Sequence, residues 1–586
     1  METNKNVLAI EETYSPLDSY KNYYKKLHDD NTINLFNKTL EKSQIDINAN
    51  RLTCNKIAEN DGQSKGNDKA IKTQNTIKTL LILLIIISII SIVYSLTYDP
   101  KAYIIILSSI LISLSVYLIK NINEKLKALR EIEDKLLKIS NELYAKAEKQ
   151  MHPLNKLLLK NYHTELFTKT LPLVKFDEIF DSKRLSYMTE NFDLNLANHQ
   201  HNSEESTLSV LSGEIKGNPF FIRNSLLHTM GTKNYEGSLT IRWTTIETDS
   251  NGKSKTVNHS ETLYASVTKP YPYYSSFSHL VYANKVADKL SFSRKPSNVD
   301  DIEDGLIFSK ERKLERLIKK RSKELQKLAE KSIKQNKTFT PLANNEFDAL
   351  FYAKDRDNET QFRLLFTPLA QQEFIKIIKE DDIGFGDDFL FIKDKMINDI
   401  YPEHLKNVKL NVTKDFFVGH NFDKMKNNFI EYHNNFFKHV FFSFAPIFAI
   451  PLYTQHQTQE YIYKDLYDSC LSFYQHEVAV NSMIDQLTPH DSVTNNIVKT
   501  SLVNSHNNID TLLVNTWGYT SYKRTDYVSK YGGDGRWHEV PVHWTEYIRV
   551  NRDSKIEVKL TKNDDQDNTS SQFKDYQFGR ISARIV

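Results

Sequence analysis

Histidine is the residue type here with the broadest capacity for acid–base and metal chemistry, and the chain contains 18. His476 precedes Glu477, but no second histidine follows four residues after the first, as a zinc-protease helix requires. His538 and His543 are five residues apart, so a flat strand would turn them to opposite faces. We therefore expect surface or core histidines at these positions and no metal site.

Carboxylates cluster at residues 380–382, 387–388 and 564–567, where a cation could bind. The last cluster lacks the glycine found in the middle of a calcium loop, and such clusters are most often solvated turns. The sequence has no phosphate-binding P-loop and no serine elbow of the G-x-S-x-G type. The sequence thus predicts no catalytic residue, metal or cofactor.

Residues 309–337 form a strongly basic segment with twelve Lys or Arg against four Glu. Leucines and Ile318 at helical spacing predict an amphipathic helix. If the helix lies in the cytosol, anionic lipid headgroups are a nearby partner, and each basic side chain contributes on the order of 1 kcal/mol. A solvated helix docked on its own domain is the main alternative. The net charge of +3 gives no global basic field, and nucleic acid is less favoured. The candidate lipid contacts are Lys313, Arg316, Lys319, Lys320, Lys323 and Lys327.

Two apolar runs, residues 77–97 and 102–119, stand back to back before these segments. Each is close to the roughly 20 helical residues that cross a bilayer core. Only residues 98–101 separate them, which predicts a transmembrane helical hairpin with both large flanks on one side. A buried hairpin of a soluble protein is disfavoured, because core helices of this length normally carry a polar face.

The charges that flank the two runs predict the orientation of the hairpin. Cytoplasmic flanks of membrane spans are enriched in Lys and Arg. Four basic residues stand on each flank, whereas the turn holds one Lys and one Asp. The flanking residues are Lys65, Lys69, Lys72 and Lys78 before the spans, and Lys120, Lys125, Lys127 and Arg130 after them. We expect both termini to be cytoplasmic in a cell-membrane protein with two spans.

A periodic apolar stripe follows the second run and predicts that its helix continues as a stalk to about Gln150. The stripe could pair with a second copy of the chain as a short coiled coil, or it could pack on its own chain. Both alternatives fit the pattern. Its members are Ile122, Leu126, Leu129, Ile132, Leu136, Ile139 and Leu143.

The periodicities together predict an α+β membrane protein: a two-helix transmembrane hairpin, a helical stalk, then cytosolic β-rich and mixed α/β domains. In chain order we expect a polar cytosolic tail (1–75, with a flexible linker at 60–75), the hairpin (76–120), the coiled-coil-like stalk (121–165), a β-rich domain (166–300), the basic amphipathic helix (301–338), an α+β region (339–455), a helical segment (456–510) and a C-terminal β region (511–586).

Within the α+β region, residues 347–353 and 361–366 alternate in a way that predicts strands. Thr367-Pro368 has the character of an N-cap followed by proline at the first helical position, so a helix should run to about Lys379. Residues 421–445 and 458–483 predict helices, and the apolar run 440–452 predicts buried core. The strands near residues 237–268 and 512–560 resemble each other loosely, which suggests a duplicated sheet unit.

Two stretches of this chain resemble the bacterial membrane proteins catalogued as domain of unknown function 3137. One is Gly213 to Phe220, which is similar to the family's G-x-x-x-G-x-P-F strand; Tyr235-Glu-Gly237 follows it. The other runs from Phe347 through Asp355 to Pro368 and looks like the family's aspartate turn and R-x-L-L-T-P step, although Phe366 interrupts that pattern. The resemblance implies a bacterial source, two spans and a cytoplasmic α+β region over about residues 76–400, but no activity.

A membrane-anchored cytosolic interaction or scaffold protein is the function that these observations favour. Its partners would be the lipid bilayer, an unknown protein and, through the stalk, a second copy. The alternative is a membrane-bound hydrolase whose site is assembled only in the fold, because catalytic groups need not be neighbours in the chain. That hypothesis requires a carboxylate and at least two of four histidines, His420, His476, His538 and His543, to line one pocket.

Overall fold

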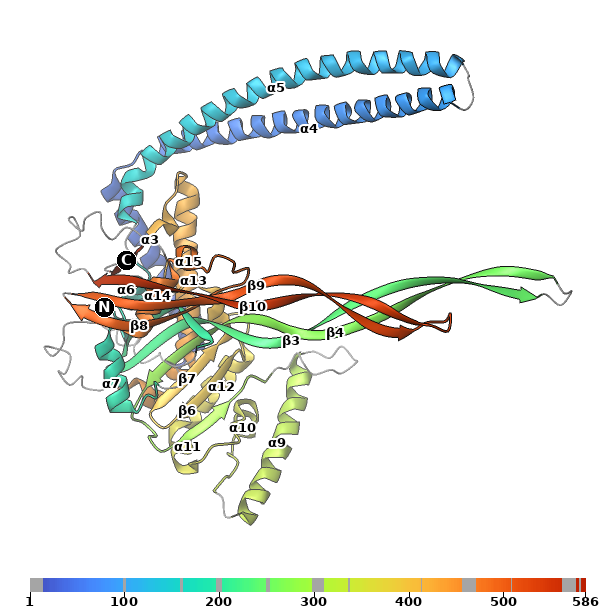
Figure 1. Ribbon diagram of the computed structural model, residues 1–586. Coiled ribbons are helices and arrows are strands. Elements are labelled where there is room, and N and C mark those ends of the chain that lie inside the picture. Colours follow the sequence, from blue (N-terminus) through green and yellow to red (C-terminus); the bar gives the residue numbers. More distant parts are fainter. Residues whose placement is uncertain are drawn as a thin grey trace. The chain divides into compact units, whose positions relative to one another are not determined.

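The computed structural model describes residues 14–97, 102–158, 162–196, 203–248, 253–297, 310–335, 338–412, 414–455, 471–506, 508–560, 576–578 and 581–586 (Figure 1). Internal contacts divide the chain into two units. The α/β unit comprises Met1–Thr32, Asn161–Thr413 and Tyr432–Val586, and the helical unit comprises Ile33–Lys160 and Lys414–Glu431. Each unit has its own packing and is described separately.

Two long helices, α4 (Ile47–Thr97) and α5 (Ala102–Leu157), dominate the helical unit. The predicted flexible linker at residues 60–75 is wrong, because these residues lie within α4. Asn and Gly have poor helix propensity, but here α5 supplies compensating contacts. The amide groups of Asn60 and Asn67 donate to the backbone oxygens of Leu136 (3.1 Å) and Leu129 (2.9 Å) on α5.

Both long helices include a stretch that is long and apolar enough to cross a membrane. Where these stretches face each other, small side chains are buried and larger apolar ones point outward. The buried residues recur seven apart: Ser88 and Ser95 on α4, Ser108 and Ser115 on α5. Small residues of this kind let two helix backbones approach closely in lipid. The two stretches therefore have a small-residue seam and an apolar exterior.

The predicted stalk is confirmed as a helix, since α5 continues to Leu157 without interruption. Beyond the apolar stretch, α5 packs on α4 of the same chain. Ile122 and Leu126 are buried there, and the Tyr144 hydroxyl donates to Asp61 at 3.2 Å. Part of the stripe therefore packs on the same chain, whereas Ile132 and Ile139 are exposed, and pairing with a second copy stays a prediction.

A seven-stranded antiparallel sheet forms the centre of the α/β unit, in the order β1-β2-β3-β4-β7-β6-β5. Its strands are β1 (Val174–Phe176), β2 (Glu205–Ile215), β3 (Asn218–Thr248), β4 (Ser254–Ala283), β5 (Ser291–Arg294), β6 (Phe389–Asp394) and β7 (Ile397–Pro402). Strands from residues 166–300 and 339–455 thus share one sheet. The two predicted separate domains are wrong.

Alternating residues of the sheet are buried against helices on both faces. Phe220 and Ile222 contact the core that contains α13 (Phe422–Phe448), whereas Phe221 packs in the core of α7 (Ser182–Phe192) and α14 (Phe473–Asn481). This alternation follows from the two-residue period of a strand. The predicted helix at 421–445 and the predicted burial of 440–452 are confirmed in large part, with Phe441, Phe444 and Phe448 fully buried.

Three short helices, α10 (Asn345–Phe351), α11 (Glu359–Leu365) and α12 (Pro368–Lys379), pack beside this core. The predicted strands at 347–353 and 361–366 are wrong. The side chains of Asn344 and Asn358 accept hydrogen bonds from backbone amides three residues on, and so act as N-caps of α10 and α11. The cap and proline predicted at Thr367 and Pro368 are confirmed.

The smaller elements complete the α/β unit. The first described residues form α2 (Pro16–Ser19), the π-helical turn η2 (Tyr20–Tyr24) and α3 (Lys25–Ser43), of which α3 spans the division between the units. Further short helices are α6 (His163–Thr170), η4 (Glu403–Asn407), η6 (Pro451–Thr454) and α15 (Ile484–Leu487). The turn η5 (Lys414–Phe417) belongs to the helical unit.

A second antiparallel sheet has the order β11-β12-β10-β9-β8. Its strands are β8 (Ile497–His506), β9 (Ile509–Tyr531), β10 (Trp537–Leu560), β11 (Tyr576–Phe578) and β12 (Ile581–Ile585). The prediction of a helical segment over 456–510 is wrong at its end, because β8 lies there. Helix α14 bridges both sheets: Val478 packs with the first and Val480 with the second.

The strand triplets β2-β3-β4 and β8-β9-β10 share one topology, as the predicted duplication requires. Each consists of a short strand followed by a long hairpin, and each short strand carries a register irregularity. A helix that begins one or two residues after a bridged residue precedes each triplet: α7 follows Asp181 and α14 follows Leu471, with the short α15 between α14 and β8. A duplication would account for all of these correspondences.

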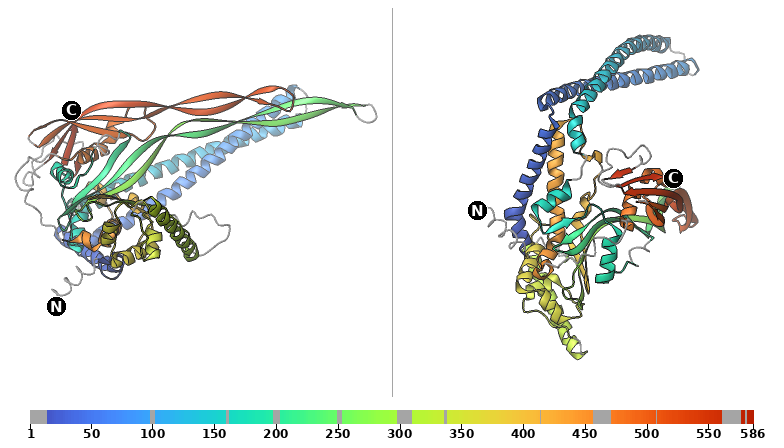
Figure 2. Two further views of the ribbon diagram at one scale, coloured as in Figure 1. Left: turned by 90° about the horizontal axis from the view of Figure 1, so that it is seen from below. Right: turned by 90° about the vertical axis from the view of Figure 1, so that its left-hand side faces the viewer.

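Both long hairpins extend beyond their sheets as two-stranded ribbons that lie side by side (Figures 1 and 2). Their contact is apolar and includes Ile241 and Leu263 from one ribbon and Val540 and Val542 from the other. At Gly237 the backbones meet so closely that a Cβ atom would overlap the carbonyl oxygen of Pro541. We call the paired ribbons, residues 231–279 and 520–548, the β-arm.

Some predicted features lie outside the described residues. They are the connection 98–101, the first part of the helix predicted at 458–483 and the acidic cluster 564–567.

Candidate functional site

Helix α9 (Lys310–Lys334) contains the six residues predicted to contact lipid. One side of this helix is docked on α10 and the segment that follows it. Leu325 is buried, the Arg321 side chain donates to the carbonyl oxygen of Ala349 at 3.3 Å, and its guanidinium lies 4.4 Å from the ring centre of Tyr352. Burial lowers the pKa of Arg321. The docked-helix alternative is thus correct for this side.

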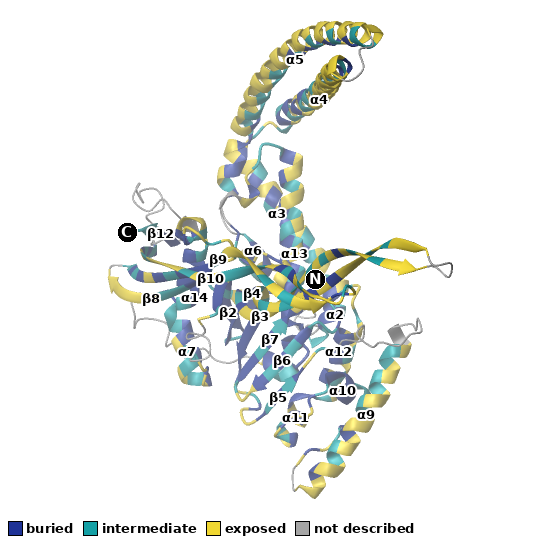
Figure 3. Ribbon diagram, turned by 45° about the vertical axis from the view of Figure 1, so that its right-hand side comes forward, coloured by how far each residue is buried: buried dark blue, intermediate teal, exposed yellow. Residues whose placement is uncertain are grey.

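The opposite side of α9 remains at the surface (Figure 3). Five of the six predicted contact residues are exposed there, and Lys313 is half-buried. The exposed five are Arg316, Lys319, Lys320, Lys323 and Lys327. The helix therefore combines a docked face with a basic outer face, and contact with lipid stays a prediction.

A pocket of about 550 Å³ opens beside the C-terminal end of α9. Lys331 on α9 and Lys354 on the following segment are two of its lining residues, and Phe339 and Arg356 form part of its wall. The side chain of Arg356 is fully buried. This pocket offers two lysines, but the guanidinium of Arg356 in its wall is already engaged, as the next contacts show.

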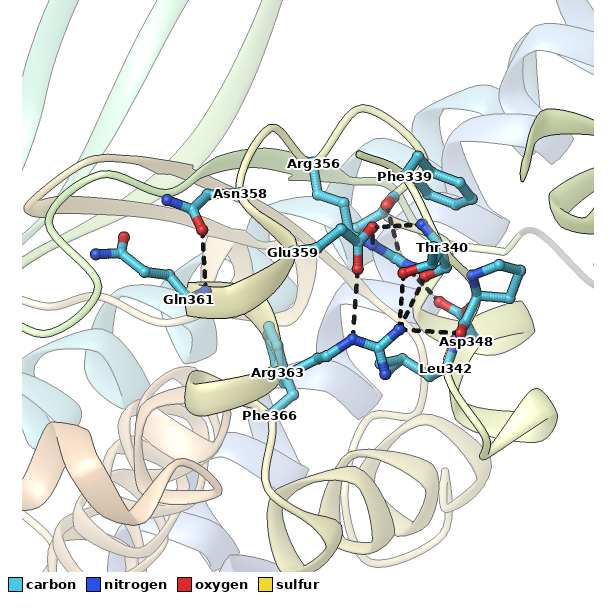
Figure 4. Close-up of polar contacts among 12 residues, drawn as sticks. Phe339, Thr340, Leu342, Asp348, Arg356, Asn358, Glu359, Gln361, Arg363 and Phe366 are labelled. Atoms are coloured by element: carbon cyan, nitrogen blue, oxygen red, sulfur yellow. Dashed lines mark hydrogen bonds and ion pairs between the residues drawn. The ribbon is translucent and has the colours of Figure 1, made fainter. Parts of the chain in front are cut away.

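Arg356 is bound on all sides by protein groups (Figure 4). Its guanidinium pairs with the Asp348 and Glu359 carboxylates at 2.7 Å each and donates to the carbonyl oxygen of Thr340 at 2.8 Å. The rings of Phe339 and Phe362 lie 4.3 and 4.5 Å from it. A buried cation with two carboxylates and two aromatic faces has a structural role here.

The aspartates on either side of Arg356 hold the edge of the first sheet. Asp355 accepts a hydrogen bond from the backbone amide of Ser293 at 2.9 Å, and Asp357 accepts one from Ser291 at 2.7 Å. Both serines belong to β5, the edge strand. This aspartate turn is part of the family resemblance. Its carboxylates accept hydrogen bonds from backbone N–H groups of β5 that are not paired with another strand of the described sheet.

The histidines of the hydrolase hypothesis occupy different settings. His476 is buried and pairs with Asp510 at 2.9 Å. His538 bonds to Asp534 (2.9 Å) at the β9–β10 turn, and His543 bonds to Thr525 (2.8 Å) farther along the ribbon. In the described part of the α/β unit, these three histidines do not line a shared pocket.

His420 lies in the helical unit and lines a pocket of about 470 Å³ there. Glu148, His152 and Lys156 from α5 also line it, and the amide side chain of Asn155 donates to the carbonyl oxygen of Gly419 at 3.0 Å. Among the described residues no group of three or more His, Cys, Asp or Glu is arranged to hold a metal ion. Polar side chains line much of this pocket, but within the described residues it offers no metal site.

The acidic cluster 387–388 is used in two internal contacts. Asp387 pairs with the buried guanidinium of Arg294, and Asp388 bonds to Nδ1 of His404 at 2.5 Å. In the cluster 380–382, Glu380 accepts hydrogen bonds from the backbone amides of Asp382 and Ile383, which closes a turn. These carboxylates therefore stabilise the fold.

Ser443, His404 and Asp388 form a Ser–His–Asp arrangement that sequence reasoning missed. The Ser443 hydroxyl is 3.4 Å from Nε2 of His404, whose Nδ1 meets Asp388. However, Ser443 is fully buried, and its hydroxyl donates to the carbonyl oxygen of His439 at 2.8 Å. A nucleophile must be reached by substrate, so this cluster is structural. The three residues lie far apart in the sequence, and no local motif marks them.

The β-arm carries a surface that the sequence analysis did not single out. Tyr527, Tyr531 and Trp537 are 64%, 60% and 71% exposed. Tyr531 pairs directly with Trp537 across the ribbon, and Tyr527 pairs with Pro541, so all four residues share one face. The Tyr531 and Trp537 rings touch edge to face, with centroids 5.6 Å apart. We call Tyr527, Tyr531 and Trp537 the aromatic face.

No family model, curated protein or solved structure matches this chain. The surfaces described above are therefore interpreted from their own chemistry. Of these, the basic face of α9 and the aromatic face of the β-arm are the most exposed.

Proposed function

We propose that this chain is a membrane-anchored scaffold, held by the α4–α5 hairpin, which presents its α/β unit to partners in the cytosol. Two helices able to cross a membrane support the anchor. The basic residues on both flanks support a cell-membrane location with two spans and both termini cytoplasmic. The proposed kinship with the domain of unknown function 3137 family agrees with this arrangement.

The aromatic face of the β-arm is the observation that carries the scaffold proposal. Soluble surfaces seldom gather large exposed aromatic rings, and such clusters mark interaction sites. Tyr and Trp are enriched in protein interfaces because they bury a large apolar area while their polar atoms keep hydrogen bonds. A protein partner with an apolar surface would fit this face.

The β-arm is suited to hold such a face away from the body of the sheets. β9 and β10, which carry the aromatic face, have 23 and 24 residues. At roughly 3.3 Å per residue, strands of this length extend for about 75–80 Å. The apolar contact between the ribbons stiffens both of them, because an isolated two-stranded ribbon is only marginally stable.

Site-specific photo-crosslinking in cells tests the proposal. A photoreactive amino acid at Tyr531 or Trp537 should yield a discrete adduct with one protein. The same residue at Thr240 or Thr262, which are exposed on the ribbon β3–β4, serves as the matched control. Identical adducts at all four positions, or none at Tyr531 and Trp537 in a well-expressed chain, would contradict the proposal.

The exposed basic side of α9 supports a second role, contact with anionic headgroups of the membrane that anchors the chain. Both roles are compatible, since they use different surfaces. The hydrolase alternative has no comparable support in the described residues, because its three histidines in the α/β unit each have a separate partner.

A further inference from the structure

The pocket of about 470 Å³ in the helical unit holds polar side chains that the fold itself does not use. Glu148, His152 and Lys156 are spaced four residues apart, so they lie on one face of α5. His420 lines the same pocket from the segment before α13. In the described part of the chain, the polar ends of these four side chains have no hydrogen-bond or ion-pair partner. We call this cavity the α5 pocket.

Two buried asparagines fix the side of the α5 pocket that carries His420. The Asn155 side chain donates to the carbonyl oxygen of Gly419 at 3.0 Å and accepts from its backbone amide at 3.3 Å. The Asn50 side chain donates to the carbonyl oxygen of His420 at 2.8 Å and accepts from the backbone amide two residues further on at 3.1 Å. The His420 ring also packs edge to face on Tyr144, with centroids 4.9 Å apart. The wall is therefore pre-organised, which lowers the entropic cost of binding.

We propose that the α5 pocket binds the phosphate group of a small soluble compound. Lys156, His152 and His420 supply nitrogen donors from two elements, and a phosphate ester has three strong acceptor oxygens. A carboxylate has only two oxygens and matches three donors less well. Hydrogen bonds to an ionised phosphate are also stronger than those between neutral groups. Glu148 precedes Lys156 by eight residues, about 12 Å along the helix, and can accept from a hydroxyl or amino group elsewhere on the compound.

The volume and the position of the α5 pocket define the kind of compound. Pockets for small molecules enclose roughly 300–1,000 Å³, so this cavity has room for an organic part beside the phosphate, with Val418 in its wall. Glu148 follows Ile119, the end of the apolar run, by 29 residues, which corresponds to about 43 Å of helix. A headgroup layer is only about 5–7 Å thick. For a chain held by the proposed anchor, the phosphate therefore comes from a soluble compound and not from a lipid.

Histidine footprinting of the full chain in phosphatidylcholine nanodiscs tests the proposal. Diethyl pyrocarbonate modifies accessible imidazoles, and mass spectrometry reports the rate at each histidine. Glycerol 3-phosphate is the probe, and sodium chloride at equal ionic strength is its control. His490 is the reference, because its side chain is 99% exposed. Lys156→Met removes the ammonium group from the pocket, whereas Lys149→Met removes an exposed lysine that does not line it.

We expect the probe to slow modification of His152 and His420 about tenfold at ten times its Kd, because only the free pocket reacts. His490 should keep its rate. Lys156→Met should abolish the protection, Lys149→Met should retain it, and His420→Gln should weaken the protection of His152. Absence of protection, equal protection by chloride, or protection that survives Lys156→Met would overturn the proposal.

A second arm distinguishes the two sources of phosphate. Nanodiscs that contain phosphatidic acid, without the soluble probe, should leave the rates at His152 and His420 unchanged. Protection by these nanodiscs would identify a lipid headgroup as the ligand and would contradict a soluble compound. The probe experiment gives the same result in detergent as in nanodiscs if the pocket binds a soluble phosphate, so its outcome does not depend on the proposed anchor.

Discussion

Buried histidines are the residues whose protonation should govern the stability of the α/β unit. Nδ1 of His28 lies 2.9 Å from the Thr170 hydroxyl, and its Nε2 lies 3.1 Å from the carbonyl oxygen of His433. His163 is buried against the ring of Phe436 at 4.6 Å. Burial, with a smaller effect of His433, lowers the pKa of His28 and of His163 to about 3.

These lowered pKa values predict loss of stability in acid. Above pH 6.5 both states carry neutral imidazoles, and the full stability is present. Below it, the unfolded chain binds protons that the folded one excludes, so each histidine lowers the free energy of unfolding by about 1.4 kcal/mol per pH unit until the folded pKa is reached. Chemical unfolding at pH 7 and pH 5.5 measures this slope.

The matched variants isolate the two histidines. The double variant His28→Gln/His163→Leu should show a smaller change in the free energy of unfolding between pH 7 and pH 5.5. His490→Gln should leave it unchanged, because that side chain is 99% exposed. If the free energy of unfolding falls equally with pH in the unchanged protein, the double variant and His490→Gln, other groups cause the loss of stability in acid.

Arg356 provides a second test at the residue scale. Arg356→Met removes the cation that balances the buried Asp348 and Glu359 carboxylates, and breaking such a cluster costs about 3–5 kcal/mol. Arg363→Met, which removes a more exposed partner of Glu359, should cost less than about 1 kcal/mol. Denaturant unfolding compares the two, and similar losses would argue against a special role for Arg356.

At the scale of elements, local signals predicted some helices well and missed others. Thr367-Pro368 carries its cap and first-turn signal in adjacent residues, so the start of α12 was predictable. Helices α10 and α11 have seven residues each, too few to show a helical period, and their Phe-rich sequences alternate like strands. Their Asn344 and Asn358 caps were the signals that could have identified them.

Helix α4 shows the opposite problem, because its polar half has little helical propensity of its own. The side-chain amides of Asn60 and Asn67 stabilise this half by hydrogen bonds to backbone oxygens of α5, which lie more than sixty residues away in the chain. A single sequence cannot reveal that register. The predicted basic face of α9 was recoverable because one helix carries all of it. The aromatic face was not, since it combines residues of β9 and β10.

The basic face of α9 leads to a prediction about lipid contact. An environment-sensitive dye on Lys320→Cys, in the cysteine-free full chain, should shift to the blue when nanodiscs contain phosphatidylserine. Each basic residue at an anionic surface contributes on the order of 1 kcal/mol, and salt screens this attraction. The shift should therefore decrease in high salt.

Two comparisons make this measurement decisive. Nanodiscs of phosphatidylcholine alone should give no shift, and replacing Arg316, Lys319, Lys323 and Lys327 by Glu should remove the shift in anionic discs. An equal shift in neutral and anionic discs would mean that α9 does not recognise headgroup charge.

For the whole molecule, the two long apolar helices were predictable from composition, whereas the association of strands was not. The first sheet joins β4 to β7, so Leu280 pairs with Ile400 across more than a hundred residues. The shared topology of the two strand triplets also emerges only from pairing. The sequence therefore predicts the α+β class and the two long apolar helices better than it predicts domain boundaries.

The central claim is that a helical hairpin anchors the chain with both large flanks in the cytosol, and reporter fusions test it most directly. Fused after Val586, green fluorescent protein should fluoresce and alkaline phosphatase should be inactive, while phosphatase inserted between Asp99 and Pro100 should be active. The membrane fraction should retain the chain after alkaline washing. An active phosphatase after Val586, or release of the chain by the wash, would contradict the account.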